Sequence, residues 1–114
     1  MTELIEDKKQ INLIINSKIK NKKIIFTDYY NIGIMKRNIP HEKVLEIFPQ
    51  FDKVFAIEKD TLKFGDIGYE LFYKISNNIT FSIGTCPKDK NILIIHAVEY
   101  RRSLGKRFAN IRLK

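Results

Sequence analysis

After Asp52 the apolar residues of this chain follow a period of two, and this alternation limits the fold more than any other feature of the sequence. In residues 67–75, IGYELFYKI, alternate positions form an apolar face of Ile67, Tyr69, Leu71, Tyr73 and Ile75. The pattern is typical of a strand with one buried face. Similar segments lie at 52–59, 78–85 and 91–98, separated by turn signals rich in Gly, Asn, Ser and Pro. Four strands joined by short connections predict an antiparallel meander.

The residues before Asp52 favour helices. Acids near the start and lysines near the end of residues 3–20 suit a helix dipole, and four apolar residues recur there at helical spacing: Leu4, Ile11, Ile15 and Ile19. We therefore expect an amphipathic N-terminal helix within residues 1–21. Its apolar stripe is expected to face the core, and the alternative is a dimerisation surface.

A strand and two short helices are expected next. Residues 22–27, KKIIFT, are short, apolar and β-branched, which predicts a strand. Asp28 suits the cap of a helix, and Pro40 suits the first turn of another. The first helix carries Tyr29, Ile32 and Met35 or Lys36 at three- and four-residue intervals. The expected buried face of the second helix consists of Val44, Leu45, Ile47 and Phe48.

The length of the chain bounds the architecture. A chain of 114 residues makes one domain and can bury a core without metal or disulfide support. We expect an α+β fold over residues 1–114, with the N-terminal helices packed on one face of a mainly antiparallel sheet of four to five strands. It would consist of the helix at 1–21, a core at 22–98 and a C-terminal segment at 99–114.

Positive charge is concentrated in the last fourteen residues. The net charge is +8, and without the six cations of residues 101–114 the chain holds 15 basic and 13 acidic residues. These six are Arg101, Arg102, Lys106, Arg107, Arg112 and Lys114. A localised basic segment attracts nucleic acid, an acidic protein or an anionic membrane surface, and charge alone does not choose among them.

Several classes of protein are disfavoured. Cys86 is the only cysteine, so no internal disulfide forms, and it lies in an expected turn without a neighbouring His or second Cys to activate it. The N-terminus lacks the features of a signal peptide, and no segment has the length of a membrane span. We expect a cytoplasmic protein. No glycine-rich phosphate loop, paired catalytic carboxylates or metal-ligand spacing is present, so we expect no cofactor and no metal.

The segment IIFTDYYNIGIMKRNIPHEKVLEIF, followed by a sheet containing LFYKI and ILIIHA, resembles a group of small domains usually placed in the RelE-like toxin superfamily. These domains open with Phe-Thr-x-His-Ala, then Arg-Met, then Arg-Gly-Ile before a helix. Phe26, Thr27, Arg37 and Ile39 match this pattern, over a resemblance that covers about residues 23–98. Tyr29 replaces the His, and Gly33 stands in the place of the first Arg.

The resemblance implies a β-sheet with helices on one face and a concave basic surface opposite. It also implies cleavage of messenger RNA by attack of the RNA's own 2′-hydroxyl, without metal. The superfamily has no single fixed triad, and its members use varying sets of Arg, Lys, His, Tyr or Glu. The two replacements are consistent either with a loss of activity or with a transfer of the chemistry to other residues.

Such a cleavage requires a base, an acid and cations near phosphorus. The candidate catalytic residues are His96, Tyr100 and Arg102. Imidazole titrates near neutrality, so His96 suits a base or an acid; the alternative is a hydrogen-bonded residue at the edge of the core, on the face shared by Ile92 and Ile94. His41 is expected to be solvated, and Tyr69 and Tyr73 are expected to pack in the core, although aromatic residues on a sheet can also stack bases.

Cations of the C-terminal segment, together with Arg37, are the candidate nucleic-acid contacts: Arg37, Arg101, Arg102, Lys106, Arg107 and Arg112. Arginine holds phosphate through two parallel donors. Apolar residues are interleaved with these cations, namely Leu104, Phe108, Ile111 and Leu113. The interleaving predicts a short docked amphipathic segment, and the alternative is a solvated tail.

Two hypotheses follow. The first is a RelE-like protein that binds RNA, including ribosome-associated mRNA, and cleaves it without metal, with an acidic antitoxin as a further partner. The second is a noncatalytic accessory or inhibitor protein of a mobile element or virus, which binds nucleic acid or a protein through its basic face. The loss of the expected His and Arg favours the second.

Overall fold

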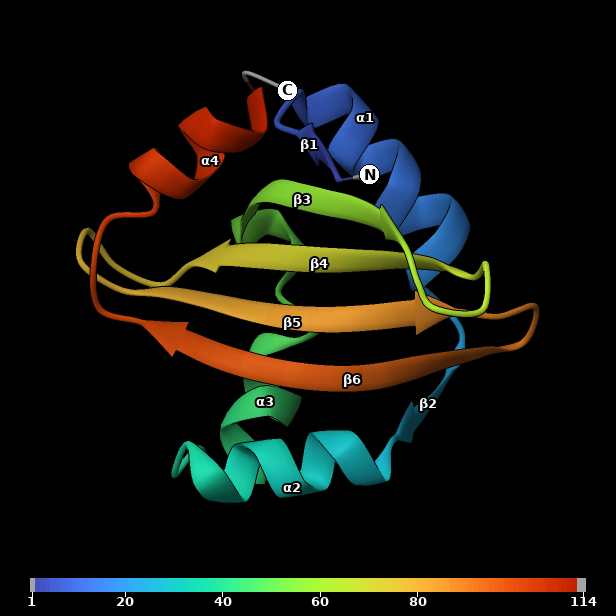
Figure 1. Cartoon of the computed structure of the whole chain (residues 1–114). Coiled ribbons are helices and arrows are strands. Elements are labelled where there is room, and N and C mark those ends of the chain that lie inside the picture. Colours follow the sequence, from blue (N-terminus) through green and yellow to red (C-terminus); the bar gives the residue numbers. More distant parts are fainter. Residues whose placement is uncertain (1, 113–114) are drawn as a thin grey trace.

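The computed structural model describes residues 2–112 and contains one six-stranded sheet with helices around it (Figure 1). The strand order is β1-β3-β4-β5-β6-β2. The strands are β1 (Glu3–Ile5), β2 (Lys23–Phe26), β3 (Val54–Thr61), β4 (Ile67–Lys74), β5 (Thr80–Pro87) and β6 (Asn91–Tyr100). The helices are α1 (Lys8–Ile14), the π-helix η1 (Ile15–Ile19), α2 (Asp28–Lys36), α3 (His41–Ile47), the 3-10 helix η2 (Phe51–Lys53) and α4 (Gly105–Arg112).

The predicted meander is confirmed. Strands β3, β4, β5 and β6 pair in sequence order, and each pair is antiparallel. The strand predicted at 22–27 is β2, which pairs parallel with β6 at one edge of the sheet. The sheet has one strand more than expected because β1 pairs antiparallel with β3 at the other edge. The fold is therefore α+β with a mostly antiparallel sheet. No helix within residues 2–112 is long and apolar enough to cross a membrane.

The N-terminal helix begins later than predicted. Glu3–Ile5 form β1, where their backbone groups pair with the exposed edge of β3. The helix starts at Lys8, because the Asp7 side chain accepts a hydrogen bond from Gln10 N and caps it. The predicted helical stripe is thus correct for Ile11, Ile15 and Ile19, which are buried, and wrong for Leu4.

Helix α2 exists where expected but presents a different face to the core. Thr27, rather than Asp28, is the N-cap. Tyr30 and Ile34 are buried, whereas Tyr29, Ile32 and Met35, which recur at helical spacing in the sequence, are 65%, 55% and 77% exposed. The buried face is selected by contacts that the helix sequence does not reveal, since the Tyr30 ring packs on Phe26 and its hydroxyl is 2.9 Å from His41 Nδ1.

Helix α3 agrees more closely with the sequence. Val44, Ile47 and Phe48 are buried as predicted, but Leu45 is 46% exposed. His41 is only partly exposed and bonds Tyr30, so its expected solvation is wrong.

One face of the sheet carries the main core. Helices α1, η1, α2 and α3 all contribute buried side chains to a single cluster with this face. Tyr69, Leu71 and Tyr73 belong to the cluster, which confirms the predicted face of β4. The Tyr73 hydroxyl donates to the Phe48 carbonyl at 2.7 Å, so its polar atom is satisfied inside the core.

The opposite face, called here the second face, is covered by α4 alone among the described helices. Leu104 and Phe108 pack against Ala56 and Phe72 in a smaller cluster, with Leu4 and Tyr100 at its edge. The predicted docking of the C-terminal segment is confirmed for residues up to Arg112. Leu113 and Lys114, which were also assigned to it, lie outside the described residues.

Candidate active site on the second face

A β-bulge decides the position of His96. Ala97 pairs with Ile83 and His96 with Gly84, but Ile94 pairs with Thr85, so Ile95 is an extra residue in β6. An extra residue reverses the alternation of a strand. Ile94 and Ala97 consequently both face the main core, and His96 faces the opposite way. Its predicted placement on the face of Ile92 and Ile94 is wrong for this reason.

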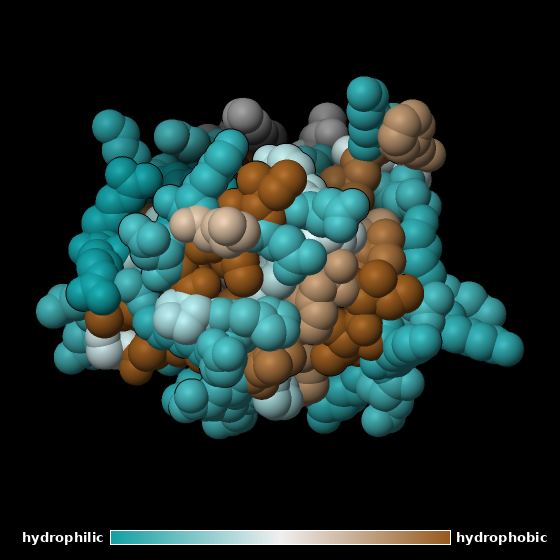
Figure 2. Space-filling view, turned by 90° about the horizontal axis from the view of Figure 1, so that it is seen from below, coloured by the Kyte–Doolittle hydropathy of each residue, from teal (hydrophilic) through white to brown (hydrophobic). Residues whose placement is uncertain are grey.

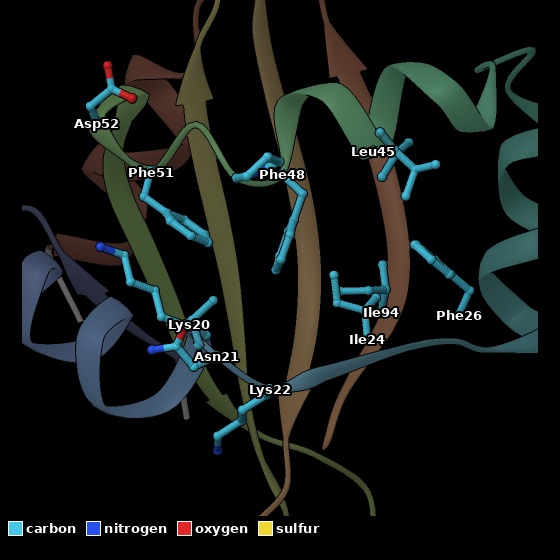
Figure 3. A pocket seen from close by; sticks show the side chains of 13 residues that line it. Lys20, Asn21, Lys22, Ile24, Phe26, Leu45, Phe48, Phe51, Asp52 and Ile94 are labelled. Carbon is cyan, nitrogen blue, oxygen red and sulfur yellow. The ribbon is translucent and has the colours of Figure 1, made fainter. Parts of the chain in front are cut away.

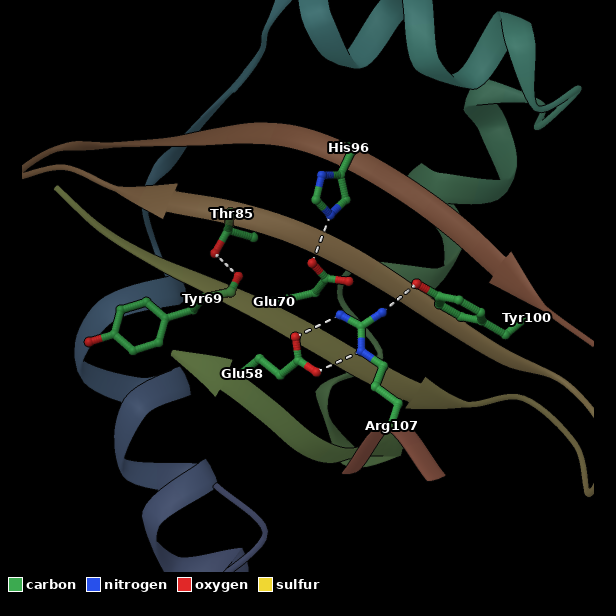
Figure 4. Close-up of polar contacts among 7 residues, drawn as sticks. All are labelled: Glu58, Tyr69, Glu70, Thr85, His96, Tyr100 and Arg107. Atoms are coloured by element: carbon green, nitrogen blue, oxygen red, sulfur yellow. Dashed lines mark hydrogen bonds and ion pairs between the residues drawn. The ribbon is translucent and has the colours of Figure 1, made fainter. Parts of the chain in front are cut away.

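His96 forms a pair with Glu70 on the second face (Figure 4). The two residues align across the sheet, because Gly84 pairs with Glu70 on one side and with His96 on the other. The imidazole Nε2 is 2.8 Å from Glu70 Oε1. A Cβ atom at position 84 would lie 2.6 Å from that nitrogen, so only glycine leaves room for the ring to reach across β5.

Arg107 of α4 lies in the same cluster. Its Nε and Nη2 donate to the two oxygens of Glu58 at 2.9 and 2.8 Å, and its Nη1 donates to the Tyr100 hydroxyl at 3.1 Å. The guanidinium also lies 5.5 Å from the centre of the Phe72 ring. The hydrogen bonds to Glu58 raise the pKa of Arg107 above its ordinary value, so it remains charged.

Glu70 is an ionised carboxylate with restricted access to water, since its side chain is 16% exposed. Burial by itself would raise its pKa, but the hydrogen bond and charge of His96, together with the charge of Arg107, outweigh burial and hold the pKa below the ordinary value. A carboxylate in this state can fix the orientation of an imidazole and stabilise its protonated form.

A cavity of about 210 Å³ opens beside this pair. Its lining includes Glu58, Glu70, Gly84 and His96. The volume is below the 300 Å³ or so that drug-sized ligands occupy. The site therefore suits a small reacting group of a larger molecule that lies on the surface.

The structure brings together only part of the predicted catalytic set. Tyr100 lies in the cluster, four residues after His96 on the same strand, β6. Arg102 does not: it is exposed beyond the end of β6. The arginine of this cluster is Arg107, which the sequence had suggested only as a nucleic-acid contact.

Several predicted phosphate-binding cations already have acidic partners. Arg101 pairs with Glu99, Arg107 with Glu58 and Arg112 with Glu6. Within residues 2–112, Arg37, Arg102 and Lys106 form no such ion pair. Half of the described candidate contacts are thus partly neutralised, which reduces their attraction for a polyanion.

Two of the unpaired cations, Arg37 and Arg102, lie near the end of β6 together with other basic residues. Arg101 lines two cavities, one of about 520 Å³ with Arg37 and Lys43, and one of about 560 Å³ with Lys74 and Arg102. Glu99 lies in the first, where it pairs with Lys43 as well as Arg101. We call the five cations of this region, Arg37, Lys43, Lys74, Arg101 and Arg102, the basic rim.

Glu58, Glu70 and Gly84 were missed by reasoning from sequence. An acid between Tyr69 and Leu71 in the apolar strand YELFY was a visible signal for Glu70, because a carboxylate on a packed strand needs a partner. The identity of the partner, His96, required the register of the three strands β4, β5 and β6. Cys86 also differs from expectation: it lies buried in β5 rather than in a turn, and burial raises the pKa of its thiol.

No three His, Cys, Asp or Glu side chains between residues 2 and 112 are arranged to hold a metal ion. Comparisons with protein-family models, with curated proteins and with solved structures find no match to this chain.

Proposed function

We propose that this protein is an RNA-binding protein of the RelE-like toxin type that cleaves RNA without metal, using His96 and Glu70. One observation carries the proposal: a hydrogen-bonded imidazole and carboxylate share the second face with an arginine and a tyrosine. Such a set provides an acid–base group and a cation for a phosphoryl reaction.

His96 is the proton-transfer group in this proposal. Glu70 holds its Nε2, and Nδ1 lies on the other side of the ring, away from Glu70 (Figure 4). The RNA 2′-oxygen attacks phosphorus as it loses its proton to the His96 ring, the bond from phosphorus to the 5′-oxygen breaks, and that oxygen takes up a proton from the same ring. The products are a 2′,3′-cyclic phosphate and a free 5′-hydroxyl.

Arg107 and Tyr100 would face the phosphate. Guanidinium has five N–H donors, and three atoms of Arg107 make the three hydrogen bonds described above. Two N–H groups therefore remain for a phosphate oxygen. In this proposal Arg107 takes the role that the sequence suggested for Arg102, and the basic rim binds the RNA backbone at the end of the sheet.

The test is incubation of the purified protein in EDTA with end-labelled RNA, both free and on ribosomes. We expect new ends that carry 2′,3′-cyclic phosphate. His96→Ala should lower the rate by about 100-fold or more, in the range of a lost general acid or base. Arg102→Ala should weaken RNA binding while leaving the rate at saturating RNA unchanged. Intact RNA in both settings would refute the catalytic proposal.

A second function is favoured by a specific observation. Glu58 and Arg107 satisfy one another, and with Glu70 they leave a cluster that lacks excess positive charge. The basic rim would then act alone as a noncatalytic module for nucleic acid or an acidic protein. Binding that weakens steeply with salt, without cleavage, would identify nucleic acid, because phosphate contacts release counterions.

A further inference from the structure

An apolar cavity lies on the side of the molecule away from the His96–Glu70 pair. It has a volume of about 610 Å³ and opens between the end of η1, β2, α3 and η2 (Figure 3). The rings of Phe48 and Phe51 and the side chains of Ile24 and Leu45 project into it. Ile94 of β6 lines it as well. The helices on this face therefore leave part of the core surface uncovered.

Strand β2 borders this cavity and has one unpaired edge. Lys23 N donates to Lys90 O and Thr27 N donates to Ile94 O, so alternate residues of β2 direct their backbone groups at β6. The N–H and C=O groups of Ile24 and Phe26 consequently point away from the sheet. Among residues 2–112 no further strand follows β2 in the sheet order. An open edge of this kind can accept another strand.

The mouth of the cavity is basic. Residues 16–23, NSKIKNKK, contain Lys18, Lys20, Lys22 and Lys23 and no acid. Lys20 and Lys22 line the cavity, and among residues 2–112 its lining contains one acid, Asp52. The Lys20 ammonium lies 5.7 Å from the centre of the Phe51 ring, and Lys22 donates to the Lys88 carbonyl.

Exposed apolar side chains are concentrated near this edge. Of the ten large apolar residues that are exposed in the described chain, six belong to β2, α2 and α3: Ile24, Ile25, Tyr29, Ile32, Met35 and Leu45. Figure 2 shows hydrophobic side chains gathered on the corresponding side of the molecule. Concentration of apolar surface in one region indicates an interaction site rather than random exposure.

We propose that β2 and this cavity bind an extended, acidic segment of a partner protein. The segment pairs with the open edge of β2, and alternate apolar side chains enter the cavity because successive side chains of a strand point to opposite faces. Its acidic residues point to the face of Lys23, and Lys20 at the cavity adds to the attraction for a segment of net negative charge. A second copy of this chain is a poorer occupant, because a two-fold interface would bring two lysine-rich segments together.

The experiment uses the full chain and a fluorescently labelled synthetic peptide in which glutamate alternates with leucine and phenylalanine. Anisotropy measures binding. One control peptide has the same composition in a non-alternating order, and another carries lysine in place of glutamate. We expect the alternating acidic peptide to bind at least about tenfold more tightly than either control.

Backbone pairing is tested with the protein unchanged. Two further peptides carry N-methyl groups on alternate residues, one set on odd and one set on even positions. Only one set of N–H groups can face β2, so methylation of that set should abolish binding and methylation of the other should not. Equal effects of the two sets would overturn pairing at the strand edge.

Variants then locate the site. Leu45→Glu and Lys20→Glu should each weaken peptide binding by about tenfold, whereas Lys9→Glu, on the exposed start of α1, should not. Leu45 is 46% exposed, so its replacement is not expected to prevent folding. Unchanged binding in both cavity variants would overturn the proposal. A dimer of the free protein, measured by sedimentation and dissociated by the same two substitutions, would also overturn the proposal. The occupant of the cavity would then be a second copy of this chain.

Discussion

The two faces of the sheet are built from the same strands but differ in chemistry. On β4, Tyr69 and Leu71 enter a large apolar core beneath the helices, whereas Glu70, between them, enters a polar cluster. The face of the main core is filled mainly by apolar side chains of suitable volume. The second face needs specific partners, since Glu58, Glu70, His96 and Arg107 each depend on another element for charge or hydrogen bonds. Substitutions on the face of the main core should mainly lower the free energy of unfolding. Substitutions on the second face should mainly change the hydrogen bonds and ion pairs of the polar cluster.

The largest effect on stability is expected on the face of the main core. Leu71→Ala removes a fully buried side chain and leaves a cavity, which should lower the free energy of unfolding by about 3 kcal/mol. Urea titration followed by circular dichroism measures this. Leu13→Ala is the control, because Leu13 is 67% exposed. Equal effects of the two substitutions would contradict the assignment of the core.

Arg107→Ala should have a smaller effect on stability. It leaves Glu58, whose side chain is 9% exposed, without its cation. Removing one partner of a fully buried pair costs about 3–5 kcal/mol, but the Arg107 side chain is 40% exposed and solvent screens the pair. We therefore expect about 1–2 kcal/mol in the same titration. Lys106→Ala, at the neighbouring exposed position, should be close to neutral.

The interaction between Glu70 and His96 should make the stability of the protein depend on pH. The folded-state pKa of Glu70 lies below that of the unfolded chain. The stabilisation is therefore present above the unfolded value of about 4.3 and is lost as pH falls through the folded pKa. Between pH 7 and acid pH, wild type should lose more stability than Glu70→Gln, by less than about 1 kcal/mol. Parallel profiles would mean that the pair contributes nothing.

Gly84→Ala should change stability least while altering the site. The added Cβ would lie 2.6 Å from His96 Nε2, and the ring can avoid it by rotating away from Glu70. We expect a loss of less than about 1 kcal/mol, because the conformational gain of replacing glycine offsets part of the cost. NMR of the His96 ring nitrogens should show loss of the hydrogen bond. An unchanged spectrum would show that Gly84 is not required for the pair.

Sequence periodicity by itself determined most of the architecture. The period of two predicted four strands in the correct order and the correct buried face of β4, because side-chain alternation is a local property of an extended backbone. Apolar residues interleaved with cations predicted that the C-terminal segment docks, and Leu104 and Phe108 are buried accordingly.

Tertiary structure alone decided the site. One extra residue, Ile95, moved His96 to the second face, and a bulge leaves no clear mark on the pattern of apolar residues. Glu3–Ile5 became a strand because the edge of β3 supplied hydrogen-bond partners that no local pattern encodes. The acids that pair with Arg107 and Arg112 lie 49 and 106 residues earlier in the chain. Local sequence fixes the conformation of a segment, but only the packed fold determines which distant charges meet.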